Sequence, residues 1–247
     1  MSFSRRSGTF FVIVLALTAP VVSTADASGQ TPPDLSVTQI LEEIQRHTDS
    51  QAEGLKHYLA MRHYEAEYHG YATKIEAKME VEVTFDASTG KSFRIVSQSG
   101  SKLLCEKVLK RAVESEKEAS HDKGATALTP ANYKFALAGS ESLNGRPAYI
   151  LNVEPLKESK FLYRGKVWVD AADFAVAKIE AGPAKNPSFW ISRTLIRSTN
   201  AKTGDFWLPR QTRSETKVRI GGSAVLTIDY GTYAIVPDTA RRSAAAD

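Results

Sequence analysis

The sequence contains a single cysteine, Cys105, so no internal disulfide can stabilise the fold. The stability has to come from a hydrophobic core. The chain has 247 residues, 42% of them hydrophobic, which is enough for one packed core. A lipid-modified cysteine would have to follow an N-terminal apolar segment directly, and Cys105 lies far downstream. We interpret Cys105 as a packing residue.

Long hydrophobic runs are also lacking, because the apolar segment Phe10–Ala19 is too short to cross a bilayer. Arg5 and Arg6 precede it and small residues follow it, the pattern of a secretory signal. We therefore predict a cleavable signal peptide over residues 1–27 and a periplasmic protein without stable membrane insertion. An uncleaved anchor is the alternative interpretation.

Charge of one sign does not accumulate anywhere along the chain. The formal net charge is +4, and no nucleic-acid-reading motif accompanies it. We expect no nucleic-acid partner, and we attribute the charge to solubility. The remaining sequence predicts one domain over residues 28–236 and a disordered tail over residues 237–247. We expect a monomer.

Known catalytic motifs are missing as well. The sequence has no G-x-S-x-G, no P-loop, no Rossmann glycine pattern and no H-E-x-x-H. We expect no catalytic activity, no cofactor and no metal. A hydrolase assembled around His63 by folding stays open as an alternative.

Three histidines, His57, His63 and His69, recur at a regular spacing in one predicted strand. Consecutive members lie about 20 Å apart along a strand, too far for one coordination sphere. Glu65 and Glu67 share their face, and we interpret both as solvated, because no second acidic cluster completes a glycosidase-like pair.

Alternation of apolar and polar residues predicts most of the chain to be β-strand. It is clearest in Lys74–Phe85, and Asn144 with Gly145 forms a hairpin-turn dipeptide. The predicted strands are Tyr58–Tyr68, Lys74–Phe85, a strand through Phe93 and Ile95, Tyr133–Ala138, Pro147–Glu154, Phe161–Asp170, Phe174–Gly182, Trp190–Asn200, Phe206–Ile220 and Ser223–Ile235.

Two amphipathic helices complete the pattern. The first covers Ser36–His47, where Ser36 and Gln39 match a capping box. The second runs from Ser101 to about Ala119, with a charged side that we interpret as solvated, followed by a loop over Thr126–Pro130. Together these elements predict an α+β fold, a strongly curved antiparallel sheet of about ten strands with helices on its concave side.

Arg62 lies on the same face of the first predicted strand as Tyr58, Tyr64 and Tyr68. The simpler interpretation is an arginine at the rim of the sheet. If this face points inward, Arg62 is a cation among aromatic rings, suited to the acidic or carbonyl head group of a greasy ligand. The sequence does not decide which face points inward.

The segments SVTQILEEIQRH, KVWVDAADFAVAKIE and GDFWLPRQT, together with the long hairpin, resemble the LolA and LolB superfamily of periplasmic lipoprotein-sorting carriers and the related RseB sensor. The resemblance implies an unclosed half-barrel whose apolar concave face is covered by helices and receives acyl chains without covalent chemistry. It implies a gate formed by the helix from Ser101 and the loop to Pro130.

On that basis we expect the partners to be lipid or lipoprotein acyl chains, with an inner- or outer-membrane protein as a further candidate. Asp86–Ser88 stands where lipoprotein carriers often have a basic residue and proline, so another envelope amphiphile is an equal candidate for the cargo. A sensor with a filled cavity is the second interpretation. The expected cavity lining is Ile75, Ala77, Met79, Val81, Val83, Phe85, Phe93, Ile95, Tyr149, Leu151, Tyr163, Val167, Leu195, Phe206 and Leu208, and the expected lid residues are Leu104, Val108 and Leu109.

Overall fold

The computed structural model describes residues 32–121, 123–186, 191–219 and 221–236. The predicted signal peptide and the predicted C-terminal tail lie outside these residues. Within them, no helix combines the length and the apolar character needed to cross a membrane.

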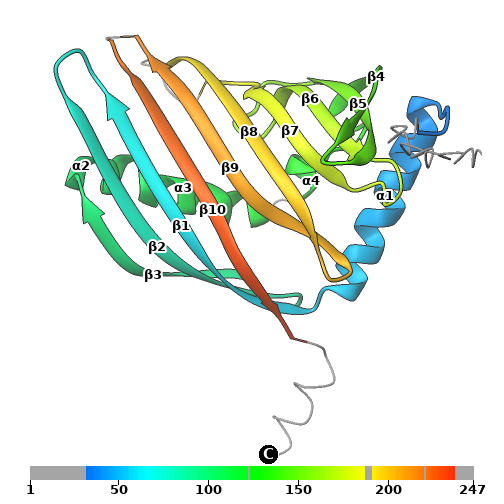
Figure 1. Cartoon of the computed structure of the whole chain (residues 1–247), viewed down its shortest axis with the longest axis horizontal. Helices are drawn as coiled ribbons and strands as arrows, with labels where there is room; N and C mark the ends of the chain where they lie inside the picture. The colour runs from blue at the N-terminus through cyan, green and yellow to red at the C-terminus, as the bar shows by residue number, and fades with distance from the viewer. Residues whose placement is uncertain (1–31, 122, 187–190, 220, 237–247) are drawn as a thin grey trace, which may run out of the picture.

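Ten antiparallel strands form one sheet (Figure 1). The spatial order is β3-β2-β1-β10-β9-β8-β7-β6-β5-β4, so β3 and β4 are the two edges and the sheet is not closed. This confirms the predicted half-barrel of the α+β class. The strands are β1 (His57–His69), β2 (Lys74–Asp86), β3 (Gly90–Gly100), β4 (Tyr133–Leu143), β5 (Arg146–Pro155), β6 (Tyr163–Asp170), β7 (Val176–Pro183), β8 (Ile191–Thr203), β9 (Phe206–Val218) and β10 (Ser223–Ile235).

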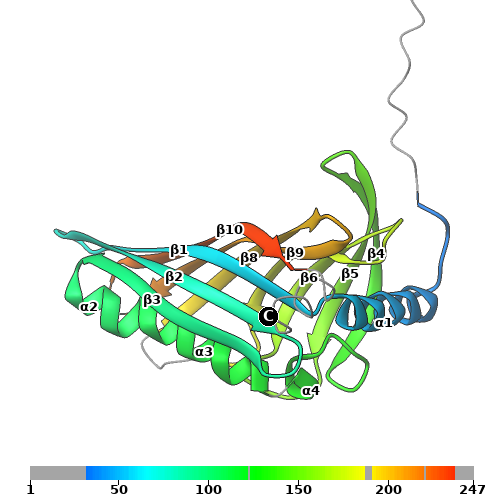
Figure 2. The same ribbon diagram turned by 90° about the horizontal axis from the view of Figure 1, so that it is seen from below.

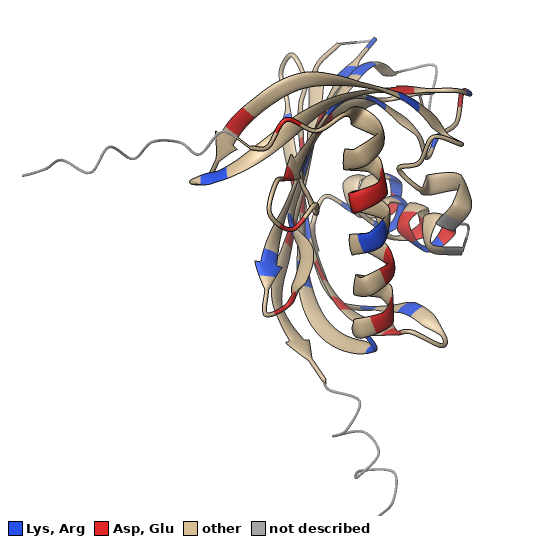
Figure 3. Cartoon of the chain, turned by 90° about the vertical axis from the view of Figure 1, so that its right-hand side faces the viewer, with Lys and Arg blue, Asp and Glu red and all other residues tan. Residues whose placement is uncertain are grey.

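The helices all lie on one side of this sheet (Figure 2), and the sheet curves around them (Figure 3). Helix α1 (Val37–Gly54) begins with the predicted capping box and extends about two turns beyond the predicted end at His47. The second helix is a rod of α2 (Lys102–Leu104), the π-helical turn η1 (Cys105–Leu109) and α3 (Lys110–His121). Helix α4 (Lys123–Thr126) precedes the stretch predicted as a loop.

The start of β7 differs from the prediction, which placed it at Phe174. The carboxylate of Asp170 accepts hydrogen bonds from the backbone N–H groups of Ala172 and Asp173, and Phe174 has a φ of 53°. The turn from β6 to β7 is therefore longer, and the strand begins at Val176. The guanidinium of Arg146 holds the same carboxylate from the neighbouring hairpin.

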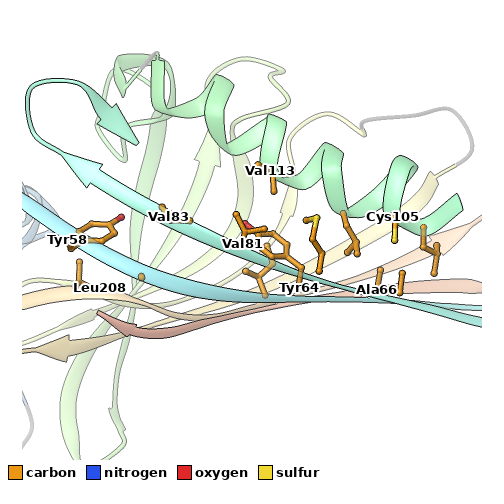
Figure 4. Close-up of a cluster of buried hydrophobic side chains, with 14 of the residues drawn as sticks. Tyr58, Tyr64, Ala66, Val81, Val83, Cys105, Val113 and Leu208 are labelled. Atoms are coloured by element: carbon orange, nitrogen blue, oxygen red, sulfur yellow. The ribbon is translucent and has the colours of Figure 1, made fainter. Parts of the chain in front are cut away.

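The two helices divide the concave face between them. Leu104, Leu109 and Val113 pack against β1 and β2 in a first core, in which Tyr64, Val81 and Val113 lie between strand and helix (Figure 4). Ile40 and Ile44 of α1 pack against β4–β7 in a second core. The inner faces of β8 and of β9 beyond Leu208 lie between these two cores, whereas most of the inner face of β10 packs in the first core. The separation of the cores thus leaves the middle of the sheet less covered than its ends.

Gly100 ends β3 in a conformation that only glycine adopts easily, with a φ of +85°. A Cβ at this position would lie 2.4 Å from the backbone oxygen of Glu76. Gly90 has nearly the same φ, +84°, but a Cβ there would meet nothing within 4 Å.

We expect Gly100→Ala to lower the free energy of unfolding by about 1–3 kcal/mol more than Gly90→Ala, because only the first change adds a clash with backbone to the same conformational strain. Urea denaturation of the two variants measures the difference. Equal losses would show that β3 can move away from Glu76 at no cost.

Candidate ligand-binding cavity and buried arginine

A cavity of about 1130 Å³ lies between the α2–η1–α3 rod and the middle strands. Ser214, Thr216 and Val218 of β9 and Ala224–Leu226 of β10 form its sheet side. Val108, Ala112 and Ser115 line it from the helix. Further lining comes from charged side chains of both signs: Lys107, Arg111, Lys160, Lys185, Glu67, Glu114, Glu118 and Glu158.

Hydroxyl groups cross the inner face of the sheet next to this cavity. Thr194 and Thr216 are hydrogen-bonded across β8 and β9 at 3.1 Å, and Ser198 and Thr212 at 2.9 Å. Leu104, Phe161 and Leu226 supply apolar lining to the same cavity. The cavity is therefore amphipathic, suited to a ligand with both an apolar chain and polar groups.

The residues predicted to line a cavity lie elsewhere, and none of them borders this one. Most are packed under the helices, because α1 and α3 bury the apolar strand faces that we expected to be open. Ala77, Met79, Val81, Val83 and Leu208 are buried in the first core, with Ile75, Phe85, Phe93 and Phe206 packed against it. Tyr149, Leu151 and Val167 are buried in the second core, with Tyr163 packed against it.

Two predicted lining residues belong to neither core. Leu195 borders a separate groove on β6–β8, and Ile95 is 38% exposed on the edge strand. Of the predicted lid residues, Leu104 and Val108 line the cavity, whereas Leu109 is fully buried in the first core. A ligand-binding role for the strand residues stays a prediction.

Arg62 is fully buried on β1, so the interpretation as a rim arginine is wrong. It pairs with Val81 on β2 and with Tyr230 on β10, which places it on the inner face beneath the helix. Its guanidinium carbon lies 4.6 Å from the ring centre of Tyr230 and 5.6 Å from that of Phe93. These distances are those of cation–π contacts, which help a cation to remain away from water.

Glu116 of α3 connects Arg62 to the edge strand. One carboxylate oxygen accepts a hydrogen bond from Nη1 of Arg62 at 2.5 Å, and the other accepts one from Nζ of Lys91 at 3.0 Å. A single helical carboxylate therefore joins β1 and β3 to α3. Two cations share this one anion, and the cluster carries a net positive charge.

Several polar atoms of the cluster have no partner within the described residues. They are Nε and Nη2 of Arg62 and the hydroxyl of Tyr64, two positions further along β1. Burial raises the pKa of Tyr64 to about 12, although the nearby guanidinium acts in the opposite direction. The hydroxyl is therefore a neutral donor at physiological pH.

The charge states of the buried pair follow from its surroundings. Burial by itself would lower the pKa of Arg62 and raise the pKa of Glu116. The interaction with Glu116 raises the pKa of Arg62 overall, and Lys91 and Arg62 together lower the pKa of Glu116 below its usual range. Arg62 and Glu116 are both ionised at neutral pH.

This shift makes part of the stability dependent on acid pH. A carboxylate with a lowered folded-state pKa stabilises the fold fully above its unfolded pKa of about 4.3, and the contribution is lost as the pH falls through the lower folded-state value. We expect the stability advantage of the wild type over Glu116→Gln to be full at about pH 6 and to shrink below about pH 4. Urea denaturation of both proteins across this range measures it. A gap that stays constant down to about pH 3 would contradict the assignment, because the surrounding Arg62, Tyr64 and Tyr230 do not titrate there.

Glu116 is not among the residues predicted from the sequence, because the whole charged side of this helix is typical of a solvated face. Leu109, Val113 and Glu116 stand at i, i+4 and i+7, so Glu116 continues the apolar stripe that faces the sheet. That position is the signal that could have identified it. The hydroxyl-bearing strands offered no such signal, because Ser and Thr alternation is equally typical of a solvated face.

The histidines lie on the other face of β1. His63 contacts Glu80 of β2 at 2.6 Å, and His69 contacts Glu67 of the same strand at 2.9 Å. Among the described residues, no group of three His, Cys, Asp or Glu side chains could hold a metal ion.

No protein-family model matches this sequence, and no curated protein does. Solved structures do match the fold. They include a DUF1329 family protein from Desulfovibrio piger, with 12% identity over 83% of this chain and 94% of that chain and a TM-score of 0.42. A LolA superfamily protein from Nitrosomonas europaea has 12% identity, coverage of 83% and 97%, and a TM-score of 0.38. A putative outer membrane lipoprotein-sorting protein domain from Vibrio parahaemolyticus has 11% identity, coverage of 83% and 96%, and a TM-score of 0.40.

Proposed function

We propose that this protein is a non-catalytic carrier that holds the acyl chain of a lipid or lipoprotein between its sheet and the α2–η1–α3 rod. The observation that carries the proposal is the amphipathic cavity of about 1130 Å³ at this place. Cavities that bury most of a drug-sized ligand have volumes of about 300–1,000 Å³. The volume is thus sufficient for an acyl chain with part of its head group.

The energetics support reversible binding. Burying an acyl chain contributes about 0.8 kcal/mol per methylene, before the cost of association is subtracted. The cost of association offsets part of this gain and leaves a moderate affinity, which a carrier needs because it also has to release its cargo. We propose that it acts in the periplasm after removal of residues 1–27, as a single domain over residues 28–236, and that the rod from Ser101 with the loop to Pro130 admits the ligand.

The direct test is a variant that fills the cavity. Ser214 lies on the cavity side of β9, and its side chain makes no hydrogen bond to another described residue that would be lost. Lys217 lies on the same strand, is exposed and does not line the cavity. We expect Ser214→Trp to weaken binding of a fluorescent fatty acid at least about tenfold, a loss of about 1.4 kcal/mol, and Lys217→Trp to leave binding unchanged. Equal affinities of the two variants would place the ligand elsewhere.

A second candidate function is an envelope sensor or interaction module with a filled interior. It is favoured by the two cores, which bury most of the apolar side chains on the inner face. This alternative predicts that the wild-type protein binds no acyl ligand at all, whereas the carrier binds one in the cavity.

A further inference from the structure

We infer that the Nε–Nη2 edge of Arg62, together with the Tyr64 hydroxyl, binds the oxyanion head group, a carboxylate or a phosphate, of an acidic amphiphile. The inference rests on the proposed carrier function and specifies its ligand class.

The guanidinium of Arg62 has one edge available to an oxyanion. Nε and Nη2 lie on the same edge of the group and donate in parallel, which matches the two oxygens of a carboxylate or phosphate. Glu116 engages only Nη1, so this edge of Arg62 has no partner within the described residues. Side chains buried this completely are normally hydrogen-bonded.

The same chain shows what this edge does elsewhere. Arg94 donates through Nε and Nη2 to the two oxygens of Glu82, at 3.0 and 2.7 Å. Arg146 donates through the same two atoms to Asp170. Both are carboxylate pairs with the fork geometry, and both involve arginines more exposed than Arg62. In Arg94 and Arg146 the Nε–Nη2 edge binds a carboxylate. Arg62 is the most buried of the three arginines, and its Nε–Nη2 edge has no such partner within the described residues.

The charge of the cluster also favours an anion. Arg62 and Lys91 are two cations paired with the single carboxylate of Glu116, so the cluster has one positive charge in excess. A monoanionic head group at Arg62 would make the cluster neutral, and it would be held by charge-assisted hydrogen bonds in a site shielded from water. The neutral Tyr64 hydroxyl supplies a third donor on the same strand face.

Arg62 and Tyr64 lie on the strand face that leads to the cavity. Ala66 lines the cavity, and Tyr64 and Arg62 follow at alternate positions along the same inner face of β1. Ala112 lines the cavity from the helix, and Glu116 lies one turn further in the same direction. Arg62 is therefore about 13 Å along the strand from Ala66. A head group at Arg62 leaves its chain directed along β1 into the cavity, past the Tyr64 ring, which turns to admit the chain while its hydroxyl stays beside the head group.

The test compares three probes with the same apolar tail: laurate, dodecyl phosphate and the neutral dodecanol. We expect the wild-type protein to bind at least one of the two anions at least about tenfold more tightly than dodecanol. The better of the two anions identifies the head-group chemistry. Arg62→Lys keeps the positive charge but loses the fork, and we expect it to reduce this preference to about threefold or less without weakening the binding of dodecanol.

Arg94→Lys makes the same chemical change in an exposed fork pair on the outer face, and we expect it to retain the full preference. NMR of the Arg62 side-chain Nε–H in the wild type gives an independent measurement that needs no variant. Its resonance should shift with the preferred anion and stay unchanged with dodecanol.

The outcomes separate the two proposals. If the anions and dodecanol bind equally and the Nε–H resonance does not move, the head-group site is overturned and the carrier stands. If no probe binds to the wild type, both are overturned.

Discussion

Replacing Glu116 with alanine is expected to lower the free energy of unfolding by about 3–5 kcal/mol, the cost of leaving a buried charge without its partner. Arg62 keeps its proton, because the pKa of a guanidinium is too high for deprotonation at any working pH. Its side chain is 1% exposed, so after the replacement it must either remain unpaired or disrupt the core to reach water. Lys91 also loses its carboxylate partner.

Glu118 provides the matched control on the same helix. It pairs with Lys160, but both side chains are more than half exposed, so Glu118→Ala should change stability by about 0–1 kcal/mol. Thermal and urea denaturation of both variants measures the contrast. Combining Glu116→Ala with Arg62→Met should recover a large part of the loss, because the double variant has no unpaired buried charge. A Glu116→Ala protein as stable as Glu118→Ala would contradict the role of this ion pair in holding α3 to the sheet.

Replacing Leu109 with alanine is expected to lower the free energy of unfolding by about 2–5 kcal/mol. Leu109 is 0% exposed, ends the π-helical turn and packs in the first core against β1 and β2. The loss has two parts, the transfer free energy of the removed methyl groups and the cavity that they leave.

Leu103 lies on the same rod and is 60% exposed. Leu103→Ala should therefore change stability by no more than about 0.5 kcal/mol. Urea denaturation of the two leucine variants tests whether the rod is held by a fixed core contact. A small loss for Leu109→Ala, close to that for Leu103→Ala, would indicate that the rod packs loosely enough to close over the missing atoms.

The sheet was predictable because its signal is local. The residues of β2 alternate in polarity, and the alternation alone indicates a strand with one apolar and one polar face. The capping box at Ser36 and the Asn144–Gly145 turn were equally local, and the structure contains both, with φ values of 53° and 81° in the turn. The Phe174 turn was not predictable in the same way, because it depends on the carboxylate of Asp170 and its backbone contacts.

The candidate site was much less predictable, because it depends on which apolar faces the helices cover. The alternation identifies Val81 and Val167 as inner residues. It does not show that the second helix buries Val81 and that α1 buries Val167. The cavity was consequently predicted to be lined by the apolar strand residues, whereas Ser214 and Thr216 line it in the structure. Arg62 was identified as a candidate from the aromatic residues beside it, whereas its pairing with Glu116, 54 positions away, required the fold.

Native mass spectrometry of the protein purified without detergent shows directly whether the cavity holds an acyl chain. We expect the wild-type protein to carry one acyl-bearing amphiphile, or to take one up when laurate is supplied. We expect Ser214→Trp to carry none and Lys217→Trp to behave like the wild type. A wild-type protein that is isolated empty and remains empty with laurate and with dodecyl phosphate would contradict the carrier function.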